Sequence, residues 1–401
     1  MISRKARSYI DASVPVLREY GLAITRTFYR NMFAAHPEFS NLFNMGNQAN
    51  GAQQQSLASA VFAYATNIEN AAALDPVIRR IAHKHASVGI KAEHYPIVGH
   101  YLLGAIQEVL GEAATPAIIA AWDEAYAELA TALINIENAL YRQTQTVPGE
   151  LRDMRVTKIR VESEDIKAFV LEAVDGQAIS AFKPGQYLSV AVKFEDGATQ
   201  LRQYSLSDAP HPQYLQISVK REQSTDNKPA GRVSNWLHKH IQLGSLIKVT
   251  HPFGDFTPDT ESTNPIVLLS AGVGITPMIS VVNRIAQVNP VREVIFAHAV
   301  KSLAWHAHRS DLDLARKRMP NLQTLTFYKD LAEADHTDPS ICAGRMLVSR
   351  LPVWPLDQAS VYLCGPVKFM QEQWRALLEA GVPAARLHRE VFGPELLNYL
   401  D

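Results

Sequence analysis

His85 is the residue of this chain best suited to bind a metal. It lies in a stretch where apolar residues recur every three or four positions, the spacing of one helix face. His83 points about 200° away around that helix, so only one of the two imidazoles can face a shared pocket. A lone histidine is more often a core or surface residue than a ligand, so its neighbours decide the matter. The apolar residues of this face are Val77, Ile78, Ile81, Ala82 and Val88.

Polar residues on other apolar helix faces indicate a pocket. Glu137 lies among leucines and isoleucines, where a carboxylate is costly unless it is paired. His85 could be its partner, because a carboxylate that accepts the ring N–H orients an imidazole and strengthens it as a metal ligand. Tyr29 needs a partner for its hydroxyl, and Gln53 and Leu57 share one face. We predict that His85 is the axial ligand of a haem iron. Because the sequence has no C-x-x-C-H motif, the group would be noncovalent haem b.

Length and composition exclude several classes of protein. The chain has 401 residues, 47% hydrophobic and 20% charged, which is ordinary globular composition and enough for two or three domains. A net charge of −1 gives no reason to expect nucleic acid or an anionic membrane as a partner. No apolar run reaches the roughly 18 residues of a spanning helix, and the N-terminus lacks the apolar segment of a secretory signal. Two cysteines are too few for a disulfide framework and fit a reducing cytoplasm.

Hydrophobic periodicity divides the chain into three segments. Residues 1–147 have helical periodicity, which predicts an all-α domain of six to eight helices with Pro15 and Pro116 in first turns. After a polar stretch that ends at Gly149, residues 148–262 alternate with period two and predict a small antiparallel β-barrel. Residues 263–401 alternate strands with helices, as in a parallel α/β sheet. The expected strands are 154–161, 166–172, 186–192, 200–205, 214–220 and 246–250 in the barrel, and 265–269, 294–298, 322–328 and 361–364 in the sheet.

Two motifs in residues 148–262 could hold a flavin. Arg202-Gln203-Tyr204-Ser205 lies on one expected strand, and Tyr187 begins another. This R-x-Y-S pattern resembles that of ferredoxin-reductase-type flavoproteins. That likeness implies an FAD site with the arginine on the pyrophosphate, the tyrosine against the flavin and the serine near its reactive nitrogen. A helix that opens at Gly231 has free N–H groups that suit a phosphate, with Ser234 as an added donor.

A glycine-containing loop in residues 263–401 could hold a nucleotide. Gly272-Val273-Gly274-Ile275-Thr276-Pro277 follows a continuous apolar strand. Its glycines allow a tight turn, Thr276 can cap the next helix and Pro277 suits the first helical position. Such a helix start can bind a pyrophosphate, and G-x-G-x-T-P resembles the NAD(P) loop of ferredoxin-reductase relatives. Cys364-Gly365-Pro366 ends a later strand, at the edge where nucleotides bind.

Several stretches of residues 1–147 resemble the globin domain of the flavohaemoglobins. The resemblance implies that His85 is the proximal haem ligand and that Tyr95 and Glu137 form hydrogen bonds around it. It implies a distal side lined by Tyr29, Gln53 and Leu57. The matching stretches are Thr27-Phe28-Tyr29-Arg30-Asn31-Met32-Phe33, His36-Pro37-Glu38, Leu42-Phe43-Asn44-Met45, Asn67-Ile68-Glu69-Asn70, Lys84-His85 and Tyr95-Pro96-Ile97-Val98-Gly99.

The resemblance extends over essentially the whole chain. In the haem pocket it adds Phe28, Phe43, which packs on the haem, and Lys84, which would tune the redox potential unless it is simply solvated. It places Cys364-Gly365-Pro366 near the nicotinamide. It also places the tail Phe392-Gly393-Pro394-Glu395 over the flavin, with Phe392 shielding the ring until nicotinamide arrives. The chain departs from some members at Val391, where they carry a cysteine, and in a longer loop at residues 222–230.

The resemblance implies an NAD(P)H-dependent nitric oxide dioxygenase, which converts NO and O2 to nitrate with electrons passed from NAD(P)H through FAD to haem b. The expected partners are these gases, with a lipid or an azole-type ligand as a further candidate for the distal pocket. We expect a cytoplasmic monomer without nucleic-acid partners or a membrane span. Two alternatives stay open: an oxygen-binding or gas-sensing globin, and an NAD(P)H-dependent reductase of iron, quinones or dyes. The sequence does not decide between NADH and NADPH.

Overall fold

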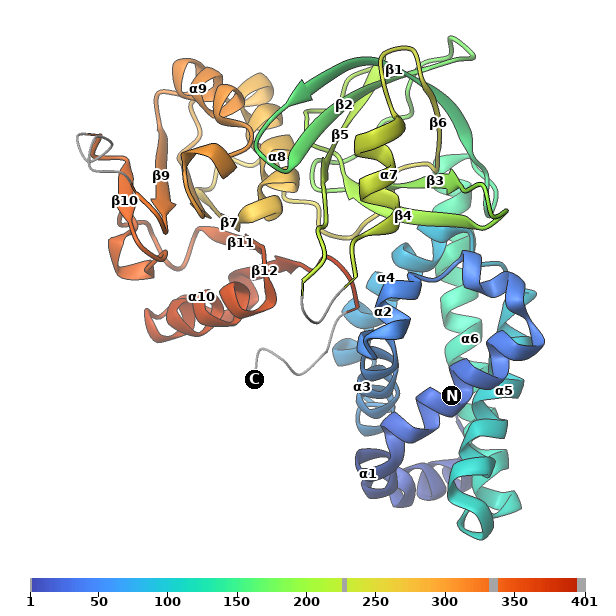
Figure 1. Ribbon diagram of the computed structural model, residues 1–401. Coiled ribbons are helices and arrows are strands. Elements are labelled where there is room, and N and C mark those ends of the chain that lie inside the picture. Colours follow the sequence, from blue (N-terminus) through green and yellow to red (C-terminus); the bar gives the residue numbers. More distant parts are fainter. Residues whose placement is uncertain (1, 226–228, 332–337, 395–401) are drawn as a thin grey trace.

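Three units follow one another along the chain in the computed structural model, which describes residues 2–225, 229–331 and 338–394 (Figure 1). The first unit is helical and occupies one end of the molecule, whereas two sheets occupy the other. Six α-helices and two 3-10 turns within the described ranges confirm the predicted all-α domain. They are α1 (Arg4–Ala35), η1 (Pro37–Asn41), α2 (Met45–Ala49), α3 (Ala52–Thr66), α4 (Ala71–Val88), α5 (His94–Leu110), η2 (Gly111–Ala113) and α6 (Pro116–Thr144).

Local sequence explains where α1 and α6 begin, but it does not explain Pro15 inside α1. The side chain of Ser3 caps the start of α1, and that of Thr115 caps α6 directly before Pro116. The prediction that Pro15 lies in a first turn is wrong, because α1 continues through it. A proline inside a helix removes one backbone hydrogen bond. Packing of α1 against α3, α5 and α6 offsets that loss.

The second unit is a six-stranded sheet in the order β4-β3-β6-β1-β2-β5. Its strand pairs are antiparallel, and a bridge between Leu206 and Ile217 joins the end of β4 to β5, the opposite edge strand. Alternate side chains such as Val156 and Leu188 fill one core. The predicted antiparallel β-domain is confirmed. Its elements are β1 (Arg152–Val161), β2 (Ile166–Ala173), β3 (Tyr187–Lys193), β4 (Thr199–Ser205), β5 (Tyr214–Lys220), α7 (Arg232–His240) and β6 (Leu246–Val249).

The third unit is a parallel sheet in the order β10-β9-β8-β7-β11-β12. All six residues of β7 are buried, because α8 and α9 cover one face of the sheet and α10 the other. The predicted parallel α/β sheet is confirmed, and β10 and β12 at its two edges were not predicted. The elements are β7 (Ile266–Ala271), η3 (Gly272–Gly274), α8 (Ile275–Val288), β8 (Val294–Val300), η4 (Leu303–Trp305), α9 (Arg309–Arg318), β9 (Leu322–Tyr328), β10 (Ile341–Ala343), η6 (Val348–Arg350), β11 (Ser360–Cys364), α10 (Val367–Glu379), η7 (Ala384–Arg386) and β12 (Leu387–Glu390).

The expected domain limits lie in the connections between these units. Helix α6 ends at Thr144 and β1 begins at Arg152, while β6 ends at Val249 and β7 begins at Ile266. The limits at 147/148 and 262/263 stay predictions. Within the part of the chain that the structure describes, no helix is both long enough and apolar enough to cross a membrane.

Candidate functional site

His85 lies on α4 with its imidazole fixed from one side. Its Nδ1 atom is 2.9 Å from Glu137 Oε1 and 3.0 Å from the Tyr95 hydroxyl, which itself donates to the same carboxylate oxygen at 2.5 Å. Glu137 is only 2% exposed, whereas the His85 side chain is 34% exposed. The ring therefore turns its Nδ1 edge toward α6 and α5, and Nε2 has no hydrogen-bond partner among the described residues.

Two tyrosines keep their protons beside this carboxylate. Burial, and after it the nearby charge of Glu137, raises the pKa of Tyr95 and the pKa of Tyr141 above the ordinary value. Tyr126 donates to the backbone oxygen of Tyr95 at 2.7 Å and so helps to fix its position. A carboxylate within hydrogen-bond distance of Nδ1 favours the imidazole tautomer that carries its proton on Nδ1 and leaves the lone pair of Nε2 free for a metal.

Tyr29 and Gln53 meet where the sequence predicts a distal pocket. The side chains of Gln53 and Gln48 lie close enough to the Tyr29 hydroxyl to lower its pKa, but burial has the larger effect and raises the pKa of Tyr29 above its usual value. Gln54 donates to Gln48 Oε1 at 2.9 Å and extends the amide network. Sequence reasoning missed Gln48, because it lies on the short helix α2, which has no buried residue and hence no apolar face to mark it.

Aromatic rings surround Tyr29 and complete this pocket. The centroid of the Tyr29 ring is 4.7 Å from that of Phe28 and 5.6 Å from that of Phe43, which reaches in from the segment between η1 and α2. Phe28 is buried, while Phe43 and Leu57 of α3 are half-buried. Half-buried apolar side chains beside Tyr29, together with an imidazole whose Nδ1 already has partners, suit a flat apolar group that carries a metal, so the residues present fit a haem.

Helix α4, which carries His85, contacts a second unit with its opposite face. This unit, the flavin-type sheet, consists of β1–β6 and the loops that connect or follow them. The imidazole Nδ1 of His83 accepts a hydrogen bond from the backbone N–H of Gly254 at 3.0 Å. Gln203 Nε2 donates to Ser87 Oγ at 2.6 Å, and Lys84 Nζ donates to the backbone oxygen of Gly393 at 3.0 Å. Sequence reasoning identified Lys84 and Gln203 for other reasons and missed His83 and Ser87 as docking residues. Their spacing on one helix face was the available signal.

Arg202 is a half-buried cation that lacks a carboxylate partner within the described ranges. Its guanidinium donates to the backbone oxygen of Leu201 at 2.6 Å and to Gln200 Oε1 at 2.9 Å, both neutral acceptors. Burial lowers the pKa of Arg202. Because a desolvated guanidinium is costly without an anion, this position fits a phosphate or pyrophosphate.

The other predicted flavin residues gather near Arg202. Tyr187 on β3 pairs directly with Ser205 on β4, and burial raises the pKa of Tyr187 well above its usual value. Tyr204 is half-buried, and burial raises its pKa. Helix α7 begins without a side-chain cap, as an anion site requires. The hydroxyl of Ser234 accepts from the Glu222 N–H and donates to the Gly231 oxygen, so its own proton is already engaged.

The two nucleotide motifs lie against each other. A Cβ atom on Gly274 would be 2.2 Å from the backbone oxygen of Cys364, so only glycine allows this contact, and Gly272 has a φ of +53°. A Cβ on Gly365 would meet Phe369 and Ala271. The Cys364 thiol is fully buried, and burial raises its pKa, so it stays protonated. Val273 of the first motif and Pro366 of the second flank these contacts.

Helix α8 begins two residues earlier than the sequence predicts. Ile275 is its first residue and Gly274 its N-cap, whereas Thr276 was expected to cap and Pro277 to come first. Thr276 instead donates to the backbone oxygen of Val273 at 3.0 Å. The 3-10 turn of η3 leads straight into α8 and shifts the register. A glycine N-cap leaves the first N–H groups without a side-chain partner, which fits a pyrophosphate.

The tail that follows β12 returns to the helical unit. Phe392 is 47% exposed, and Gly393 has a φ of +116° and accepts the hydrogen bond from Lys84. Val391 is buried. Pro394 is the last residue described, and Glu395 lies outside the described residues.

Comparisons with known proteins match this arrangement. The Globin family matches residues 26–133, the oxidoreductase FAD-binding domain family residues 153–257, and the oxidoreductase NAD-binding domain family residues 268–374. A flavohemoprotein of Chromobacterium violaceum is 47% identical over 400 residues, which cover 98% of each chain. One of Rhizobium meliloti is 45% identical over 402 residues and 99% of each chain.

Two solved structures extend the likeness to three dimensions. The flavohemoglobin of Malassezia yamatoensis with bound FAD and heme has a TM-score of 0.87 at 32% identity and covers 98% of this chain and 100% of that chain. The flavohem-like FAD/NAD-binding domain of a nitric oxide dioxygenase from Vibrio cholerae has a TM-score of 0.55 at 35% identity and covers 61% of this chain and 99% of that chain. With relatives of such identity over nearly its full length, this chain belongs to the flavohaemoprotein family.

Proposed function

We propose that this protein is an NAD(P)H-dependent nitric oxide dioxygenase that converts NO and O2 to nitrate and so detoxifies NO. One observation carries the proposal: the helix that presents His85 to a pocket presents its other face to the flavin-type sheet. Gas storage needs no such connection, because storage uses no continuous supply of electrons. Membership of a family that includes Malassezia yamatoensis flavohemoglobin supports haem and FAD as cofactors.

The residues that would hold each group follow from their chemistry. His85 would bind the haem iron through Nε2, Arg202 and the start of α7 would bind FAD phosphates, and the loop from Gly272 to Pro277 would bind NAD(P)H. When bound, these groups supply hydride transfer, single-electron transfer and activation of O2.

The chain itself supplies positioning and proton placement. Glu137 and Tyr95 hold the proton of His85 at Nδ1, which makes Nε2 a stronger electron donor. The protonated hydroxyl of Tyr29, with Gln53 beside it, can donate to a gas that acquires negative charge in the pocket. Phe28 and Phe43 exclude water from that place. Contacts of α4 with Gly254 and Gln203 fix the distance between the two redox units.

The setting of the reaction is part of the proposal. We infer that the partners are the small gases O2 and NO, and that the protein works as a monomer in the cytoplasm. The two cysteines, Cys342 and Cys364, are both free and buried, which supports a reducing compartment. A lipid or azole-type ligand in the distal pocket would compete with the gases for the space beside Tyr29.

A single pair of assays tests the proposal. In His85→Ala, tight haem binding and NO consumption should be lost, while NAD(P)H-driven dye reduction through the flavin continues. His100→Ala, which removes an exposed imidazole from α5, should retain both activities. If wild-type protein loaded with haem and fed NAD(P)H in air consumed NO no faster than buffer while reducing dyes, the reductase alternative would replace the dioxygenase.

A further inference from the structure

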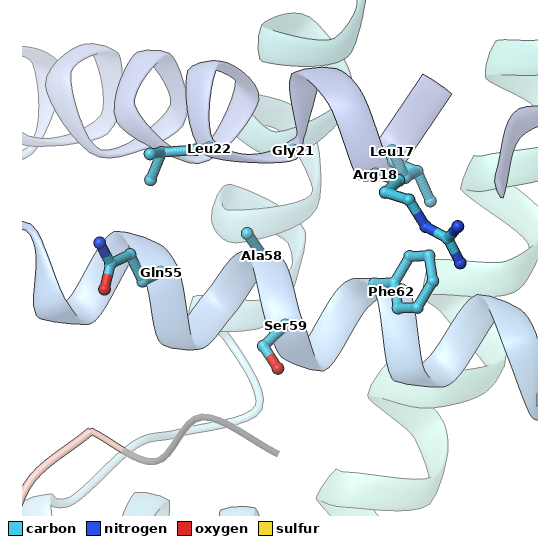
Figure 2. A pocket seen from close by; sticks show the side chains of 8 residues that line it. All are labelled: Leu17, Arg18, Gly21, Leu22, Gln55, Ala58, Ser59 and Phe62. Atoms are coloured by element: carbon cyan, nitrogen blue, oxygen red, sulfur yellow. The ribbon is translucent and has the colours of Figure 1, made fainter. Parts of the chain in front are cut away.

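A groove and a small cavity lie one beneath the other between α1 and α3, away from His85. The groove has a volume of about 360 Å³ and opens to the surface (Figure 2). The cavity is more enclosed and measures about 20 Å³. Both spaces are lined by Leu17, Gly21 and Ala58. The remaining lining of the cavity consists of Ile24, Thr25, Val61, Leu102, Ile106 and Trp122.

Two small residues separate the groove from the cavity. Figure 2 shows Gly21 on α1 and Ala58 on α3 facing each other across the space between the helices. A Cβ added to Gly21 would be 3.6 Å from Ala58 Cβ, an ordinary van der Waals contact. The mouth of the groove is polar, with Arg18, whose guanidinium lies 5.3 Å from the centroid of the Phe62 ring, and Gln55. The space therefore narrows from a mouth that carries polar side chains to a neck formed by Gly21 and Ala58.

Among its lining side chains, the cavity offers a water molecule at most one hydrogen-bond partner, the Thr25 hydroxyl oxygen as an acceptor. The Thr25 hydroxyl donates to a backbone oxygen, that of Leu22 at 3.2 Å or that of Gln54 at 3.0 Å. Trp122 Nε1 donates to Ser13 Oγ at 3.1 Å. A cavity holds water only where that water finds roughly two to four partners, and dry apolar cavities instead take xenon or similar apolar molecules. Its volume of about 20 Å³ suits one small gas molecule.

The cavity lies on the same helix faces as the distal residues. Ile24 and Thr25 precede Phe28 and Tyr29 by one turn on α1, and Val61 follows Leu57 by one turn on α3. Ile24, Phe28, Tyr29, Leu57 and Val61 belong to one apolar cluster. We propose that the groove and the cavity form the route by which apolar diatomic gases reach the distal pocket, with Gly21 and Ala58 as its neck. The identity of these gases as O2 and NO rests on the proposed function.

Xenon binding and carbon monoxide kinetics test the route without using NO. Crystals of the haem- and FAD-loaded protein under xenon pressure should show xenon in the cavity. After flash photolysis of the ferrous CO complex, CO from solution should return several-fold more slowly in Ala58→Leu, which fills the neck, and faster in Val61→Ala, which widens the cavity. Ala127→Leu, the same change at an exposed position of α6, should leave the rate unchanged.

Each outcome decides the matter. Gly21→Ala gives a milder obstruction if Ala58→Leu does not fold, because its new Cβ meets Ala58 at an ordinary distance and alanine favours the helix. Wild-type CO return in both neck variants, or no xenon in the cavity, would overturn the route. Loss of NO consumption with CO kinetics as expected would instead count against the dioxygenase alone.

Discussion

Helices α3 and α8 have similar lengths and differ sharply in burial. Helix α8 buries nine of its 14 residues between the parallel sheet and α9, whereas α3 buries only Ala65 among its 15. Apolar side chains of α3 such as Leu57, Val61 and Phe62 stay half-buried. Packing of an apolar face supplies most helix stability in proteins. Since α8 buries most of its residues against its neighbours, the nucleotide unit completes its core with the chain's own side chains. The helical unit leaves part of its core for a bound group.

Removal of haem tests this contrast and should give the largest effect. The helical unit should lose roughly 4 kcal/mol of stability when haem present at about a thousand times its Kd is taken away, while the nucleotide unit should be unaffected. Hydrogen exchange of haem-free and haem-loaded protein, measured by segment, reports both. Equal loss of protection in α3 and α8 would show that the two units do not differ in this way.

Acid should affect the nucleotide unit through His306. Burial, followed by the charges of Arg309 and Arg316, lowers the pKa of His306 to about 3, and its Nδ1 is 2.7 Å from the Tyr328 hydroxyl. Because this pKa is below the unfolded value of about 6.5, its contribution to stability is complete above pH ~6.5 and is lost as the pH falls toward 3.

The expected loss from His306 at pH ~4.5 is roughly 2–3 kcal/mol. Free energies of unfolding should be measured between pH 7 and pH 4.5 for the wild type and for His306→Asn, which cannot be protonated in this range. The variant should be less stable at pH 7 and should depend less steeply on pH. Parallel pH profiles for the two proteins would show that His306 does not titrate as proposed.

Glu137→Gln should weaken the helical unit's hold on haem. The amide keeps a hydrogen-bond acceptor near His85 and Tyr95 but removes the negative charge, so the imidazole becomes a poorer donor to iron. Loss of such a partner typically lowers metal affinity by about 10- to 100-fold. Competition for haemin with an apoglobin of known affinity measures the change, with Asp123→Asn on the exposed side of α6 as the control. Unchanged haem affinity would mean that the carboxylate only packs.

Gln203→Ala should have the smallest effect, at the junction between the helical unit and the flavin-type sheet. It removes one hydrogen bond to Ser87, worth about 1 kcal/mol. Haem reduction by NAD(P)H should slow relative to dye reduction, because the flavin-type sheet then holds α4 less firmly. Gln213→Ala, at an exposed position of the same domain, should change neither rate. If both rates fell together in Gln203→Ala, the residue would act on the flavin and not on docking.

Repeating side-chain patterns made most of the fold predictable. Buried apolar runs and period-two alternation located the central strands, and the edge strands β10 and β12 were missed because three or four residues carry too little pattern. Pro15 was misplaced, since α1 continues past it while packing against α3, α5 and α6.

The candidate site was predictable where one side chain stood out from its helix face. Glu137 on an apolar face of α6 led directly to His85, and the hydrogen bond between them is present. The hydrogen bonds of His83 with Gly254 and of Ser87 with Gln203 depend on how two domains dock, which local periodicity does not encode. Gln48 was missed for another reason, because the short helix α2 has no buried residue and hence no apolar face to mark it.

The most direct test of the account is anaerobic stopped-flow absorption of the haem- and FAD-loaded protein after mixing with NADH or NADPH. We expect the visible absorption band of the flavin to bleach first and the Soret band of the haem to shift to its ferrous position afterwards, with no added reductase. In His85→Ala the first change should remain and the second should be absent. A flavin that bleaches in the wild type while the Soret band stays in place would contradict an electron path to a haem held by His85.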